Sequence, residues 1–166
     1  MPPTDASLPQ IEQLYRQHGR PLLLFAMSIC GEASRAQDAV QQVFLRLIET
    51  GGLIRVLDIK AYLFASVRNE LFNHKKFQRK IVPIETEALW FEPPNRDYAA
   101  EINLRRALKA LPEDQRQVVV LHVWGELTFS QVAEVLSISA NTAASRYRYA
   151  FEKLRESMLA GEKADG

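Results

Sequence analysis

The segment from residue 128 to residue 155 most constrains the fold, because two helix-start signals lie close together in it. Thr128 and Gln131 have the spacing of a capping box, in which the two residues satisfy each other's free backbone N–H groups at the start of a helix. Ser139 can cap a second helix after a turn of three residues, 137–139. Two helices joined by so short a turn are typical of a helix-turn-helix.

The second of these helices has an apolar side and a polar side. At about 100° per residue, four small or apolar side chains fall within one narrow arc: Ala143, Tyr147, Ala150 and Leu154. The opposite arc carries Asn141, Ser145 and Arg148. Arginine can donate two hydrogen bonds to guanine and asparagine can pair with adenine, so the polar arc suits the major groove of DNA. A solvated helix face is the alternative.

The rest of the chain is predicted to be helical as well, with one interruption. Ser34 and Gln37 predict another capping box, and Gly31 predicts the end of the helix before it. The stretch 81–98 holds three prolines and little helical periodicity, so we expect a linker there, with Trp90 and Phe91 docked on a neighbouring domain or on a partner. Apolar spacings of three and four predict helices at 8–30, 34–49, 59–76, 100–111 and 112–124.

Composition excludes several classes of function. The 166 residues carry a net charge of +1, so affinity for an anionic polymer must come from local basic patches. The single cysteine, Cys30, fits a reducing compartment, and the N-terminus has no secretory pattern, so we expect a cytoplasmic protein. No apolar run reaches about 18 residues, so we expect no membrane span. The histidines lack the spacing of a metal site, and we expect no metal, no cofactor and no enzymatic activity.

A second basic segment lies in the N-terminal half, at residues 67–80. It contains five Lys or Arg residues, two asparagines and two phenylalanines. Basic side chains can hold a nucleic-acid backbone, and aromatic rings can stack on unpaired bases. We expect Leu71 and Phe72 to be buried. A solvated helix end is the alternative interpretation of this segment.

With these features together, the sequence resembles the bacterial sigma-70 family, specifically the group IV or extracytoplasmic-function (ECF) sigma factors. The segment SRAQDAVQQVFLRL (34–47) resembles the core-binding helix of sigma region 2, and KAYLFASVRNELFNHKK (60–76) resembles its strand-opening part. Residues 111–155 resemble region 4, and this match is the most specific. The resemblance implies an all-α fold with two small helical domains, region 2 at 8–80 and region 4 at 100–158, joined by a flexible linker at 81–99.

The resemblance also implies three sets of contact residues. The β′ clamp helices of the RNA polymerase core would be bound by Asp38, Gln41, Gln42 and Phe44. Asn73 falls at the position that helps capture a flipped base of the downstream promoter element, and Asn69, Lys75 and Lys76 lie alongside it as further contact residues. The upstream promoter element would be read by Asn141, Thr142, Ser145, Arg146 and Arg148. Further implied partners are the polymerase β flap and an anti-sigma factor.

The chain departs from the family pattern in region 2. Gln37 and Gln42 stand where the family usually has an acid, which weakens the electrostatic match to a basic clamp. Two other classes remain as alternatives, a stand-alone helix-turn-helix regulator and a degenerate sigma-like protein that titrates an inhibitor. A stand-alone regulator would hold a duplex site without polymerase, with an affinity that falls steeply with salt.

Overall fold

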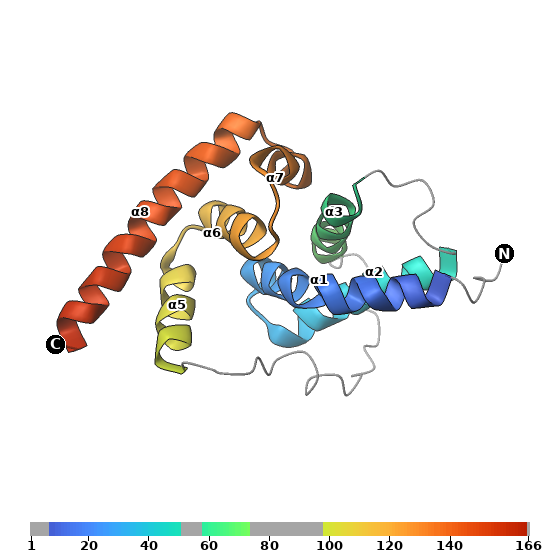
Figure 1. Ribbon diagram of the computed structural model, residues 1–166, viewed down its shortest axis with the longest axis horizontal. Coiled ribbons are helices and arrows are strands. Elements are labelled where there is room, and N and C mark those ends of the chain that lie inside the picture. Colours follow the sequence, from blue (N-terminus) through green and yellow to red (C-terminus); the bar gives the residue numbers. More distant parts are fainter. Residues whose placement is uncertain (1–6, 51–57, 74–97, 166) are drawn as a thin grey trace.

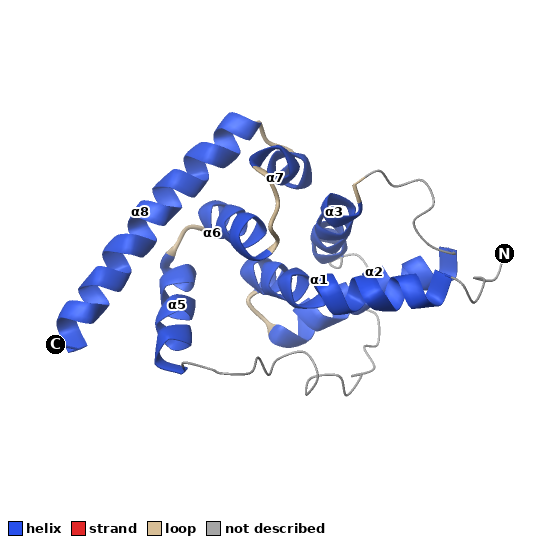
Figure 2. Cartoon of the chain, in the orientation of Figure 1, coloured by secondary structure: helices blue, strands red, loops and turns tan. Residues whose placement is uncertain are grey.

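The computed structural model describes residues 7–50, 58–73 and 98–165. The described residues form helices joined by short loops, with no strand among them, which confirms the all-α prediction (Figure 2). The expectations for the linker, for Trp90 and Phe91, and for Lys75 and Lys76 lie outside the described residues.

Three helices form the N-terminal half: α1 (Ser7–Cys30), α2 (Ala33–Thr50) and α3 (Ile59–Asn73). All three pack against one another, and Figure 1 shows α1 and α2 side by side. Their apolar stripes meet in a core in which Leu22, Phe25 and Phe64 are fully buried. The rings of Phe25 and Phe64 meet edge to face at 5.6 Å, which joins α1 to α3.

The turn between α1 and α2 follows one sequence prediction and corrects another. Gly31 has a φ of 71°, a left-handed conformation that favours glycine, and its N–H donates to the Met27 carbonyl, so α1 ends where predicted. The predicted cap at Ser34 is wrong. Helix α2 already begins at Ala33, and the Ala36 N–H donates to the Glu32 carbonyl, so Ser34 lies inside the first turn.

The C-terminal half consists of α5 (Tyr98–Ala110), α6 (Glu113–Val119), the π-helical turn η2 (Val120–Trp124), α7 (Phe129–Leu136) and α8 (Ala140–Asp165). The long helix α8 packs against α5, α6 and α7 (Figure 1). A small core around Ala107, Leu111 and Ala150 joins α5 and α6 to α8. Helices α7 and α8 have the order and the short turn of the predicted helix-turn-helix.

The two halves pack directly against each other. Helix α3 lies against α7, and α1 lies against α6 and η2. Leu121 and Leu127 of the C-terminal half belong to the same buried cluster as Phe25 and Phe64 of the N-terminal half. Gly125 lies at this junction, where an added Cβ would come within 3.0 Å of the Phe64 ring. The apolar core is therefore continuous from one half to the other.

Candidate nucleic-acid interface

Both predicted caps of the helix-turn-helix are present. The Gln131 N–H donates to Thr128 Oγ1 at 3.2 Å, and the Thr128 N–H donates to Gln131 Oε1 at 2.8 Å, which together make the capping box of α7. At the start of α8, the Thr142 N–H donates to Ser139 Oγ at 3.1 Å. Between them, Ser137 ends α7 with a φ of 57°. The turn between α7 and α8 is thus held by the Ile138 N–H, which donates to the Ala133 carbonyl at 3.0 Å, and by the Ser139 side-chain cap at the start of α8.

Helix α8 divides into the two predicted arcs. Ala143 and Ala150 are fully buried and Leu154 is nearly so, and the partly buried Tyr147 ring packs against both apolar clusters. On the other side, the polar residues lie at the surface. Asn141 and Arg148 are exposed and Ser145 is half-buried. The arc that sequence reasoning assigned to DNA is therefore open, and it is presented by a helix whose opposite side is held in the protein.

Two of the five residues predicted for the upstream element also make contacts within the protein. The Thr142 hydroxyl accepts a hydrogen bond from Ser139 Oγ at 2.8 Å, so it supports the cap. Arg146 Nε lies 3.6 Å from Asp114 Oδ2, an ion pair between α8 and the first turn of α6. Sequence reasoning missed this role of Asp114, which carries only the signal of an acid at a helix start.

The end of α3 carries the described part of the second predicted nucleic-acid site. Asn69 and Asn73 are exposed there and Leu71 is buried, as predicted. The prediction that Phe72 is buried is wrong, because 52% of this residue is exposed. The reason is helix geometry: neighbouring residues point about 100° apart, and Leu71 already occupies the core side. The Arg68 guanidinium lies 4.7 Å from the centre of the Phe72 ring, so a basic and an aromatic side chain are paired at the surface.

Helix α2 presents the residues predicted to bind polymerase. Asp38, Gln41 and Gln42 are half-buried on its surface. Phe44 lies in the core instead, with 5% of its surface exposed and its ring edge-on to Tyr15 at 5.1 Å. Phe44 therefore belongs to the apolar stripe of α2, and Asp38, Gln41 and Gln42 are the predicted residues that lie at the surface of this helix.

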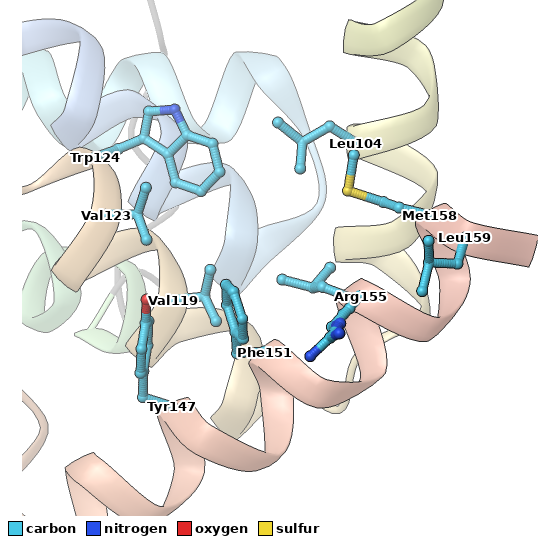
Figure 3. A pocket seen from close by; sticks show the side chains of 10 residues that line it. Leu104, Val119, Val123, Trp124, Tyr147, Phe151, Arg155, Met158 and Leu159 are labelled. Atoms are coloured by element: carbon cyan, nitrogen blue, oxygen red, sulfur yellow. The ribbon is translucent and has the colours of Figure 1, made fainter. Parts of the chain in front are cut away.

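An apolar pocket of about 350 Å³ lies between α5, η2 and α8 (Figure 3). Val123 from η2 and Phe151 and Leu159 from α8 line it and are each about half exposed, and Trp124 and Leu104 close other sides. Sequence reasoning named Tyr147 and Leu154 as core positions but did not predict this pocket. The available signal was the run of apolar residues near the end of α8, which lies beyond the arc that packs on the domain.

The described residues contain no group of three or more His, Cys, Asp or Glu residues that could hold a metal ion. In the same part of the chain, no helix is long and apolar enough to cross a membrane. The pKa of His18 in α1 is lowered by burial and by Lys60, against the opposing effect of Glu126. His18 is accordingly neutral at pH 7.

Comparisons with known proteins match both halves of the chain. The profile of Sigma-70 region 2 matches residues 14–81, and that of Sigma-70 region 4 matches residues 101–154. Two solved structures share the fold. RpoE in complex with the anti-sigma factor NepR from Bartonella quintana has a TM-score of 0.65 at 21% identity, covering 90% of this chain and 97% of that one. CnrH in complex with the cytosolic domain of CnrY has a TM-score of 0.63 at 23% identity, covering 92% and 90%.

Curated relatives are similar over most of their length. The ECF RNA polymerase sigma factor EcfG of Rhodopseudomonas palustris is 30% identical over 139 residues, which is 80% of this chain and 76% of the relative. The RNA polymerase sigma-E factor of Streptomyces coelicolor is 30% identical over 159 residues, 91% of this chain and 87% of the relative. With region 2 and region 4 present in that order on one helical fold, the chain belongs to the ECF RNA polymerase sigma factors, which bind the polymerase core and direct it to promoters to initiate transcription.

Proposed function

We propose that this sigma factor reads its upstream promoter element with the exposed arc of α8. The observation that supports this most is the contrast between the two arcs of one helix: Ala143 and Ala150 are fully buried, whereas Asn141 and Arg148 are exposed. Asn141 and Arg148 are of the types that pair with adenine and guanine edges in the major groove. Arg146 is held beside Asp114 and suits a phosphate contact, which fixes position rather than sequence.

The downstream element is assigned to the end of α3. Asn69 and Asn73 offer amides that can pair with the edge of an extruded base. The exposed Phe72 ring, backed by Arg68, offers a stacking surface beside them. Extrusion costs a few kcal/mol of unstacking, and base-pocket contacts of this kind offset that cost. We therefore add Phe72 to the predicted residues of this surface.

Two contacts with polymerase follow from the remaining surfaces. The polar side of α2, with Asp38, Gln41 and Gln42, is assigned to the β′ clamp helices. The apolar pocket between α5, η2 and α8 is assigned to the β flap, because a half-exposed apolar groove suits the apolar face of a partner helix (Figure 3). An anti-sigma factor is a further proposed partner, since the similar RpoE was solved with one. We propose that the protein acts in the cytoplasm and performs no covalent chemistry of its own.

The proposed clamp contact is tested by reversing the charge of Asp38. Asp38→Arg should weaken binding to core polymerase by about 2 to 5 kcal/mol, because it places a cation against a basic clamp. The measurement is the affinity of the labelled sigma factor for purified core by fluorescence anisotropy. Glu12→Arg is the matched control, because Glu12 is an exposed acid of α1 that pairs with the exposed Arg16. Unchanged affinity of Asp38→Arg would refute the assignment.

The activity itself is tested by run-off transcription with purified core on a library of genomic fragments. The sigma factor should direct specific initiation and should bind promoter duplex only weakly without core. The rival, a stand-alone regulator, predicts tight duplex binding by the free protein with a steep salt dependence. Tight binding without core, together with no run-off product, would favour the regulator.

A further inference from the structure

The open side of α8 carries one aromatic ring that the proposed function does not use. Tyr149 is 53% exposed, whereas Tyr147, two residues before it, packs against both apolar clusters. At about 100° per residue the two rings point about 200° apart, so they lie on opposite sides of the helix. Packing on the domain therefore accounts for Tyr147 but not for Tyr149.

Tyr149 lies within the arc of α8 that is assigned to DNA. It follows Ser145 by four residues and Arg146 by three, which places it about 40° and about 60° around the helix from them. Residues at these two spacings are neighbours on a helix surface. The Tyr149 ring is therefore placed beside the proposed base and phosphate contacts, about one turn further along α8.

The ring of Tyr149 lies against the guanidinium of Arg148. The Arg148 Cζ atom is 5.4 Å from the centre of the ring, which is within the range of a cation–π contact. Adjacent residues on a helix do not normally face each other, so this contact depends on the reach of the long arginine side chain. It restricts a side chain that has many rotamers when it is free in solvent.

Among the described residues, no acid competes with the ring for Arg148. Glu152 stands four residues further along α8, but no ion pair joins it to Arg148 in the described part of the chain. An arginine that precedes its acid by four residues is also the weaker order of such a pair. Arg146 differs, because Asp114 Oδ2 lies 3.6 Å from its Nε. One arginine of the arc is therefore placed by a carboxylate, and the other by a ring.

We infer that Tyr149 is a positioning residue for Arg148 and that it sharpens the reading of one base pair of the upstream element. This inference rests on the proposed function of α8. A bidentate contact to guanine needs the plane of the guanidinium in one orientation. A side chain that is already restricted before binding loses less conformational entropy when the complex forms. The ring therefore acts through Arg148 and makes no base contact of its own.

Tyr149→Ala tests the inference in holoenzyme, on a promoter library randomised over the upstream element. The preference at the base pair that Arg148 reads should fall about two- to fivefold, which is the range expected from an exposed cation–π contact. The preferences at the other positions should stay unchanged. Arg148→Ala identifies the base pair concerned in the same selection. An even loss over all sequences would make Tyr149 a phosphate contact and would overturn the inference.

Two single variants separate the ring from other properties of tyrosine. Tyr149→Phe keeps the face of the ring and should retain the wild-type preference, whereas a contact through the hydroxyl would be lost. Tyr149→Leu keeps apolar bulk without a π face and should behave like Tyr149→Ala. Loss in the phenylalanine variant, or retention in the leucine variant, would overturn the role of the ring.

A double variant and a melting curve complete the controls. Tyr149→Ala combined with Arg148→Ala should show no loss beyond that of Arg148→Ala alone, and losses that multiply would show that the ring acts independently. The single Tyr149 variants should melt like the wild type, because the residue is half exposed. A merely structural role would instead lower the melting temperature and weaken every position of the element together.

The contact itself is measured by NMR in the free protein. An aromatic ring displaces the resonances of protons that lie over its face, so the Arg148 side-chain protons should be shifted in the wild type and in Tyr149→Phe. In Tyr149→Ala they should return to their random-coil positions. Equal Arg148 resonances in all three proteins would overturn the contact. Failure of the proposed function is distinct, since Arg148→Ala would then leave the library preferences unchanged while the ring-induced shift remained, and the inference would fall with it.

Discussion

Helices α3 and α8 both carry promoter-facing residues, but they present them differently. On α8, Arg148 projects from a helix whose opposite side is buried over about three turns and whose start is capped by Ser139. On α3, Phe72 and Asn73 occupy the final turn, beyond the last buried residue, Leu71. Reading an intact duplex requires side chains at fixed spacing, whereas an unpaired base can move to meet a ring at a helix end. The capped and well-packed helix α8 therefore suits an intact duplex, and the end of α3 suits an unpaired base.

Disrupting the buried side of α8 is expected to have the largest effect on stability and on promoter recognition. Ala150→Glu would place a carboxylate in a fully buried position of the small core, at a cost of about 3 to 5 kcal/mol. Region 4 should lose its cooperative unfolding transition by circular dichroism, and upstream recognition should disappear. Lys153→Glu is the control, because Lys153 is exposed on the same helix. Equal melting curves for the two variants would show that the buried arc does not fix α8.

A smaller effect is expected when one reading side chain is removed and the support is kept. Arg148→Ala should lower discrimination by about 1 to 3 kcal/mol at one base pair of the upstream element, because a bidentate contact to guanine is lost. Selection from a randomised promoter library measures this preference. Arg146→Ala, at the proposed phosphate contact, should weaken binding evenly across sequences. A library preference that Arg148→Ala leaves unchanged would remove Arg148 from the reading surface.

The smallest effect is expected on α3, where recognition depends on an exposed ring. Phe72→Ala should change the free energy of unfolding by no more than about 0.5 kcal/mol, since half of the residue is already exposed. Promoter opening should weaken by on the order of 1 kcal/mol through lost stacking, as followed by 2-aminopurine fluorescence in the downstream element. Phe72→Tyr keeps the ring and should restore opening. Normal opening by Phe72→Ala would leave the asparagines as the only described candidates there.

The sequence predicts α8 well because local signals determine it. Thr128, Gln131 and Ser139 form the expected caps, and the spacing of Ala143 and Ala150 selects the buried side. The same kind of capping signal is misleading where a helix has already begun before it. A capping-box spacing at Ser34 occurs by coincidence inside a helix that begins one residue earlier.

On α2 and α3, the helices themselves were easier to predict than which of their side chains are buried. Phe44 belongs to the stripe of α2 that packs on Tyr15, and its spacing from Val40 indicates that it is buried. Phe72 falls outside the spacing of Val67 and Leu71, so its exposure could have been predicted from periodicity. In both cases the helical period was informative, and aromatic character alone was not.

The packing of the two halves against each other could not be predicted from local pattern. Leu127 and Val132 lie in a core shared by the two halves, and nothing in their apolar character distinguishes a core within one domain from a core shared by two. The bond from Gln131 to Asp58 joins residues 73 apart in sequence, and both residues already have a local capping role that accounts for them. Such contacts depend on the shapes of two finished surfaces, which single-sequence reasoning does not supply.

The π-helical turn η2 has a consequence for how the molecule can be followed in solution. A turn of this kind inserts an extra residue and displaces the side chains after it around the helix axis. Trp124, at its end, packs against both the large core shared by the halves and the small core of region 4. Its indole therefore lies where the two hydrophobic interiors meet, and in a Trp90→Phe background its emission spectrum would report solvent entry into either one.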